Sequence, residues 1–181
     1  NKLLKNIDGV PLIRNIALEI TKSDLDSCSI VLGYQSDQVA DVIKDLNINL
    51  ILNPLWKEGQ ASSLKAALNS LTSSYSDLLI MLGDLPGIKS GHINRIIEEH
   101  LSSENRRSKI TIPSFKGEKG NPVIWGRSFF HDLSNLEGDV GGRALFGQHP
   151  AAINLIEMDD PSVVTDTDTP EDFEKFIANR T

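Results

Sequence analysis

Cysteine is almost absent from this sequence of 181 residues, in which Cys28 is the only one. An internal disulfide and a cysteine-based zinc cluster are therefore excluded, and a reduced cytoplasmic setting is the simplest expectation. No segment approaches the roughly 20 consecutive apolar residues that a transmembrane helix needs, so we expect no membrane partner. Basic residues are also few, with 18 Lys and Arg against 25 Asp and Glu. The net charge of −7 disfavours nucleic-acid binding, because basic side chains supply the affinity for phosphate backbones.

What the sequence does contain is an alternation of apolar runs typical of strands with segments of helical periodicity. Strands are predicted at residues 29–32, 48–52, 77–82, 109–113, 121–125 and 152–158. Helices are predicted at 11–20, 36–46, 62–71, 90–101, 127–136 and 170–179, with a further helix starting in 138–143. This alternation predicts an α/β fold of one domain, a three-layer α/β/α arrangement with a mostly parallel central sheet. In such sheets ligands bind at the carboxyl ends of the strands.

Acidic residues stand at two places where they could hold a metal ion. Asp84 lies in the segment 83–86, Gly-Asp-Leu-Pro, directly after a predicted strand. A carboxylate there suits Mg²⁺ held between protein and phosphates, although the same residue types are ordinary in turns. Asp166 and Asp168 precede a helix start at 169–170, where Thr and Pro fit the N-cap and first helical positions. Capping does not explain these two acids, whose mutual repulsion a cation would relieve.

Two glycine-containing segments are candidates for ligand contact. Residues 53–64 join a predicted strand to a helix, and their Gly59 permits close approach of a ligand. Two neighbouring serines in this segment can bind a ligand or cap the helix, so a capped helix is the alternative. Residues 138–143 place two adjacent glycines before Arg143. Free amides and an arginine make an anion site, and a flexible loop is the alternative.

Six segments, in this order, resemble the molybdenum-cofactor nucleotidyltransferase family and most closely its cytidylyltransferase branch. The matching segments are Lys2 with Asp8-Gly9-Val10-Pro11-Leu12, Asn53 with Trp56, Gly59 and Ser62-Ser63-Leu64, Gly83-Asp84-Leu85-Pro86, Gly120-Asn121-Pro122-Val123, Gly138-Asp139 with Gly141 and Arg143, and the run 166–172. They extend over nearly the whole chain. The resemblance implies a fold of the nucleotide-diphospho-sugar-transferase type.

One feature of that family has no counterpart in this sequence. The family carries a Gly-rich loop, L-A-A-G-x-S-x-R-M-G, just before the lysine that matches Lys2, whereas this sequence opens at Asn1. We therefore expect residues 1–181 to form a single nucleotidyltransferase domain that lacks its first strand and its phosphate loop. Residues upstream of Asn1 are predicted to form that loop and to be mobile.

The resemblance implies an Mg²⁺-dependent enzyme that transfers CMP from CTP to a molybdopterin-type cofactor, releasing pyrophosphate. Such chemistry depends on positioning and charge neutralisation. Asp84 and Asp168 would bind the metal, and Lys2 would contact the phosphates and complete the catalytic set. The nucleotide would be bound by Lys2, Asn53, Gly59, Ser62, Ser63 and Asp84, and the acceptor by Gly120, Pro122, Gly138, Asp139 and Arg143.

Alternatives to cytidylyl transfer remain open from the sequence. Within enzymes they are guanylyl transfer to the same cofactor and nucleotidyl transfer to a sugar phosphate. In another class, a non-catalytic protein would bind the molybdenum cofactor and deliver it to a recipient molybdenum enzyme. The absence of the phosphate loop from this sequence keeps this last alternative open, and the sequence upstream of Asn1 discriminates between it and the enzyme.

Overall fold

A mixed five-stranded sheet lies at the centre of the computed structural model, which describes residues 1–72, 74–167 and 170–178. Its strand β8 (Val123–Gly126) runs antiparallel to both β5 (Asp77–Ile80) and β6 (Ile110–Phe115). Strand β9 (Ile153–Glu157) pairs with β6 in parallel, and the short β7 (Glu118–Lys119) forms an antiparallel hairpin with β6. The central sheet therefore contains strand pairs of both directions.

Two smaller strand pairs lie outside this sheet. Strands β3 (Ser29–Leu32) and β4 (Asn49–Leu52) are parallel and are joined by helix α2 (Ser36–Ile43). Strands β1 (Asn6–Ile7) and β2 (Val10–Pro11) form a hairpin whose turn needs positive φ at Asp8 and Gly9, 54° and 80°. The predicted α/β class with parallel strand pairs is confirmed by β3–β4 and β6–β9. Strand β8 departs from the predicted parallel arrangement. The connection 116–122 between β6 and β8 is short enough only for an antiparallel pair, because a parallel pair needs a longer crossover connection.

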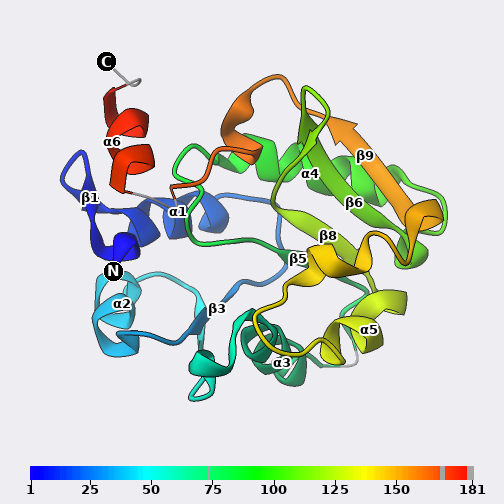
Figure 1. The fold of residues 1–181 in the computed structure, drawn as a ribbon, viewed down its shortest axis with the longest axis horizontal. Helices are drawn as coiled ribbons and strands as arrows, with labels where there is room; N and C mark the ends of the chain where they lie inside the picture. The colour runs from blue at the N-terminus through cyan, green and yellow to red at the C-terminus, as the bar shows by residue number, and fades with distance from the viewer. Residues whose placement is uncertain (73, 168–169, 179–181) are drawn as a thin grey trace.

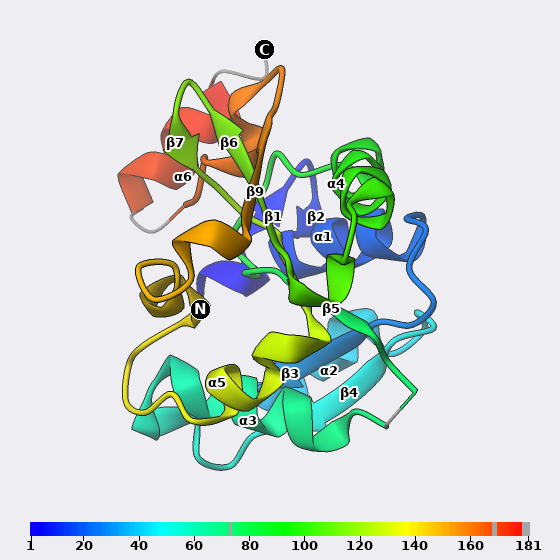
Figure 2. The same ribbon diagram turned by 90° about the vertical axis from the view of Figure 1, so that its right-hand side faces the viewer.

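Helices cover both faces of the strands, as the three-layer prediction requires. Figure 2 shows α3 (Gln60–Ser70) and α5 (Phe130–Ser134) together on one side, and α1 (Leu12–Thr21) and α4 (Ser90–Ser102) on the other. Successive residues of β8 supply both layers. Ile124 packs in the cluster that includes Ile16, Ile93 and Ile96, and Trp125 packs in the cluster that includes Phe129, Leu133 and Phe146.

The remaining elements are short, apart from α6 (Pro170–Ala178) near the C-terminus (Figure 1). The short elements are single turns of 3-10 helix, namely η1 (Lys2–Leu4), η2 (Trp56–Glu58), η3 (Arg106–Ser108), η4 (Arg127–Phe129), η5 (Gly142–Leu145), η6 (Pro150–Ala152) and η7 (Pro161–Val163). None of the helices in the described ranges is long and apolar enough to cross a membrane.

Helix boundaries follow the sequence prediction except in the segment 127–145. The helix predicted at 127–136 is shorter and begins as the 3-10 turn η4. The helix predicted to start in 138–143 is wrong, because residues 138–141 are irregular and η5 covers only Gly142–Leu145. Gly138 has a φ of +70°, which a right-handed helix does not allow. The backbone here leaves the helical path to contact α3, as described below.

Candidate functional site

Lys2 and Asp84 meet although 82 residues separate them in the sequence. Residues 83–84 follow β5, and η1 lies against them because Leu3 packs over Gly83, where a Cβ would lie 3.4 Å from Leu3 Cδ2. Lys2 Nζ donates to Asp84 Oδ2 at 2.7 Å, and the Asp84 side chain is 15% exposed. The charged pair is thus positioned by the packing of η1 against the segment that follows β5, a strand of the central sheet.

The second carboxylate oxygen of Asp84 is the notable feature of this pair. Asp84 Oδ1 is buried and has no hydrogen-bond partner within the described part of the chain. Buried polar atoms are normally paired, and an unpaired anionic oxygen is a hard ligand of the kind that Mg²⁺ and Mn²⁺ prefer. The chemistry of this oxygen therefore fits a divalent cation, and the role of Asp84 as a metal ligand stays a prediction.

The segment that leads to Asp168 also reaches Asp84. Thr167 is almost fully buried, and its amide and its hydroxyl both donate to the carbonyl oxygen of Asp84 at 3.2 Å. Asp168 itself lies outside the described residues, so its convergence with Asp84 stays a prediction. Within the described ranges, no three His, Cys, Asp or Glu side chains gather to hold a metal. Any fuller ligand set at Asp84 would therefore include Asp168, substrate oxygens or water.

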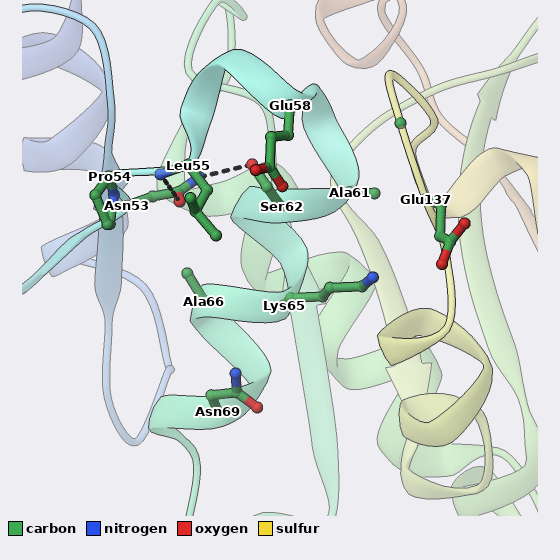
Figure 3. A pocket seen from close by; sticks show the side chains of 11 residues that line it. Asn53, Pro54, Leu55, Glu58, Ala61, Ser62, Lys65, Ala66, Asn69 and Glu137 are labelled. Carbon is green, nitrogen blue, oxygen red and sulfur yellow. Dashed lines mark hydrogen bonds between the residues drawn. The ribbon is translucent and has the colours of Figure 1, made fainter.

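Asn53 follows β4 and is the centre of a buried hydrogen-bond network (Figure 3). Its Nδ2 donates to Ser62 Oγ at 2.9 Å and to Ser63 Oγ at 3.1 Å, and its Oδ1 accepts from Leu55 N at 3.0 Å. Only 3% of Asn53 is exposed. The structure therefore shows Asn53 positioning the two serines at the start of α3, and its direct contact with a nucleotide stays a prediction.

A pocket of about 520 Å³ opens beside this network. Asn53 and Leu55 form one wall, Ser62 and Lys65 of α3 form the floor, and residues 137–138 lie opposite. Figure 3 shows Lys65 extending from α3 toward Glu137. The pocket thus joins part of the predicted nucleotide segment to the start of the predicted acceptor segment.

Residues 138–139 bind the first turn of α3. Gln60 N donates to Asp139 Oδ1 at 3.2 Å, and Ala61 N donates to the carbonyl of Gly138 at 3.1 Å. Gly59, at the N-cap of α3, has a φ of +103° and no side chain that could cap the helix. The family resemblance implied that Gly59 binds the nucleotide and that Asp139 binds the acceptor. Neither assignment predicted that the two segments are in contact.

The other predicted acceptor residues lie around β7 and η7. Arg143 is exposed and donates from Nη2 to the carbonyl of Lys119 at 2.9 Å. Gly120 is buried, donates to Pro113 O at 2.7 Å and packs against Val163 so closely that a Cβ would collide with the Val163 carbonyl. Pro122 is also buried and follows a cis peptide bond. Gly120 and Arg143 are therefore neighbours through Lys119, while their contact with an acceptor stays a prediction.

Sequence reasoning missed a buried polar cluster at the opposite end of β5. His100 contacts Thr111 Oγ1 through Nδ1 at 2.8 Å and Asp77 Oδ1 through Nε2 at 3.2 Å. Burial lowers the pKa of His100, against the opposing effect of Asp77. Burial alone would raise the pKa of Asp77, but hydrogen bonds from Ser76, His100 and Arg106 lower it overall. The sequence contained a signal for this cluster, because His100 continues the apolar face of α4 and Asp77 is the first residue of β5.

Comparison of the sequence with known families identifies the family of this chain. A family model described as the MobA-like NTP transferase domain matches residues 1–153, which is most of the chain. The chain belongs to the MobA-like NTP transferase family. This membership confirms the resemblance drawn from the ordered motifs, and the MobA-like family suggests the molybdenum-cofactor branch.

A curated relative is similar to this chain over part of a longer protein. The bifunctional protein GlmU of Prochlorococcus marinus (strain MIT 9211) is 24% identical over 136 residues. The match covers 75% of this chain but 29% of GlmU, so the chain spans less than a third of that relative. The similarity thus concerns one region of GlmU.

Solved structures share the fold over almost the entire chain. The Rv0371c homologue from Mycobacterium sp. strain JC1 superposes with a TM-score of 0.83 at 24% identity, covering 98% of this chain and 87% of that one. The manganese complex of Rv0371c from Mycobacterium tuberculosis H37Rv gives 0.81 at 21% identity, covering 98% and 91%. CMP:2-keto-3-deoxy-manno-octonic acid synthetase complexed with CTP gives 0.77 at 12% identity, covering 99% and 91%. At these identities the likeness establishes the nucleotidyltransferase fold.

Proposed function

We propose that the protein transfers CMP from CTP to the terminal phosphate of a molybdopterin-type cofactor and releases pyrophosphate. The observation that carries the proposal is the Lys2–Asp84 pair, with its buried carboxylate oxygen left without a partner in the described part of the chain. The pair places a cation that can bind phosphate oxygens beside an anion that can bind a divalent metal. Membership of the MobA-like family supports the reaction class, and the ordered motifs support the cytidylyl branch.

In this reaction a phosphate oxygen of the acceptor forms a bond to the α-phosphorus of CTP. The bond from that phosphorus to the bridging oxygen breaks, and pyrophosphate leaves with the electron pair. The protein contributes positioning and charge neutralisation rather than covalent chemistry. Lys2 holds phosphate oxygens, and the serines fixed by Asn53 face the nucleoside.

A divalent cation, Mg²⁺ in our proposal, would be held by Asp84 together with Asp168. When bound it neutralises charge that develops on the leaving pyrophosphate. Manganese in a structure of the same fold is in keeping with a divalent metal at this family's site. Arg143 would bind the acceptor phosphate as a bidentate donor, close to Gly120 and Pro122.

Pyrophosphate release tests the proposal directly. The purified protein and Mg²⁺ are incubated with each of the four nucleoside triphosphates and with either molybdopterin or a sugar phosphate as the acceptor, and pyrophosphate and the nucleotidyl product are measured. We expect release with CTP that depends on both the acceptor and the metal. Release with GTP instead would indicate guanylyl transfer, and release only with a sugar phosphate would replace the acceptor. Tight cofactor binding without release under any combination would favour a delivery protein.

A further inference from the structure

The N-terminus of α3 is completed by a loop that comes from far along the chain. Asp139 supplies a side-chain acceptor to Gln60 N, and Gly138 supplies a backbone acceptor to Ala61 N. A separation of 79 residues lies between Gln60 and Asp139. We call these two hydrogen bonds the α3 latch. They replace the N-cap that Gly59 cannot provide, because the first amides of a helix have no partner within it.

The fit between the two segments leaves no room for side chains at the contact. A Cβ on Gly59 would lie 2.5 Å from the carbonyl carbon and oxygen of Gly138, and one on Gly141 would collide with the Gln60 amide. A Cβ on Gly142 would lie 2.7 Å from Trp125 in the core. Glycines on both sides therefore let the loop pack at backbone distance against α3 and the central sheet.

Each end of the α3 latch continues into one half of the proposed site. The helix turn that the latch closes carries Ser62 and Ser63, which Asn53 fixes on the nucleotide side. The loop runs on into η5, where Arg143 donates to the Lys119 carbonyl beside Gly120 on the acceptor side. The two hydrogen bonds of the latch, four residues of backbone from Asp139 to Arg143, and the Arg143–Lys119 hydrogen bond thus join the two halves. The carboxylate of Asp139 also occupies the Gln60 amide, which would otherwise be available to a phosphate, in keeping with the proposed placement of the triphosphate at Lys2.

We infer that Asp139 is a positioning residue that couples nucleotide binding at α3 to the acceptor loop around Arg143. This inference rests on the proposed function and replaces direct acceptor binding by Asp139. When a nucleotide orders the first turn of α3, the latch transmits that order to η5, and acceptor binding strengthens nucleotide binding by the same factor. Without the carboxylate, the two halves bind their ligands independently.

Hydrogen–deuterium exchange of the whole protein, without nucleotide and with Mg²⁺ and each of the four nucleoside triphosphates in turn, CTP being the expected ligand, tests the coupling. The variants are Asp139→Ala, which removes the cap, and Asp139→Asn, which keeps a capping oxygen of similar strength. Asp41→Ala is the matched control, because it removes an exposed carboxylate on α2 that pairs with Lys44. The reporting amides are those of residues 60–62 and, in η5, those of Ala144 and Phe146, which donate to the carbonyls of Gly141 and Arg143.

In the unliganded protein, we expect Asp139→Ala to raise exchange at 60–62 about fivefold, the typical effect of losing a helix cap. Asp139→Asn and Asp41→Ala should leave it near the wild-type rate. CTP with Mg²⁺ should protect 60–64 in all four proteins, and protection should reach Ala144 and Phe146 in all except Asp139→Ala. Protection that stops at α3 in the wild type, or that reaches η5 without Asp139, overturns the coupling alone. If none of the four nucleoside triphosphates protects 60–64, the proposed function fails and the coupling fails with it.

Discussion

The sharpest prediction concerns Asp84→Asn, which removes one charge while keeping the shape of the side chain. The amide can no longer serve as an anionic ligand, and Lys2 Nζ loses the carboxylate oxygen at 2.7 Å. Because Asp84 Oδ1 is buried without a hydrogen-bond partner in the described part of the chain, the same change also removes the desolvation cost of a buried anionic oxygen. Activity and stability should therefore respond very differently.

The effect on stability follows from the exposure of the pair. Lys2 is 34% and Asp84 15% exposed, so solvent screening limits the ion pair to about 1 kcal/mol. Removing the carboxylate recovers part of its desolvation cost, which opposes this loss. For a chain of 181 residues, about 1 kcal/mol corresponds to a Tm shift of roughly 2–4 °C. We expect Asp84→Asn to melt within that interval of the wild type.

The effect on the reaction is much larger if Asp84 binds the metal. Losing a metal ligand removes several kcal/mol of transition-state stabilisation. A loss of about 4 kcal/mol corresponds to roughly a thousandfold in rate, since each 1.36 kcal/mol is about tenfold. Pyrophosphate release under saturating CTP and Mg²⁺ should therefore fall by about three orders of magnitude.

A matched control separates the metal role from the loss of an ion pair. Asp45→Asn breaks the Arg14–Asp45 pair, whose Nη1–Oδ1 distance is 2.6 Å, away from the site. It should leave pyrophosphate release unchanged, and thermal unfolding is measured on both variants in the same buffer. Near-normal release by Asp84→Asn would refute the metal assignment and reduce Asp84 to a turn residue. A large fall in the Tm of Asp84→Asn would mean that its lost activity results from unfolding and not from loss of the metal.

Three further outcomes follow from the contacts described. Asn53→Ala should lower the free energy of unfolding by about 1–3 kcal/mol, because it leaves the partners of a buried amide unpaired, and should raise the KM for CTP; unchanged chemical denaturation would contradict this. Arg143→Ala should raise the KM for molybdopterin in steady-state kinetics with that for CTP little changed, and equal weakening of both would remove Arg143 from the acceptor side. Stability should fall as the pH drops below about 6.5, because His100 resists protonation when folded, and should fall further below about 4 as the lowered pKa of Asp77 takes effect. Urea unfolding between pH 5 and 8 should show this slope, and His100→Gln should flatten it over that interval.

Local sequence patterns were sufficient for most of the longer strands and helices and for the family. The apolar runs predicted β3, β6, β8 and β9 because each strand is specified by neighbouring residues. The ordered motifs led to the MobA-like family, and a polar residue after each strand located Asp84 and Asn53. Turn and spacing rules operate over a few residues, so a short stretch of sequence contains all the information that these features need.

Tertiary contacts decided what those residues do. The contact of Asn53 with a nucleotide stays a prediction, whereas the hydrogen bonds of its amide to Ser62, Ser63 and Leu55 are contacts that only the packing of β4 against α3 could show. Asp139 caps α3 and the segment 138–141 is irregular, because hydrogen bonds to Ala61 and to Gln60, which is 79 positions from Asp139, outweigh the local tendency to form a helix. The pairing of Lys2 with Asp84, 82 residues apart, has the same origin. A sequence window contains no information on which distant segment will lie across a crevice, since that depends on how whole layers pack.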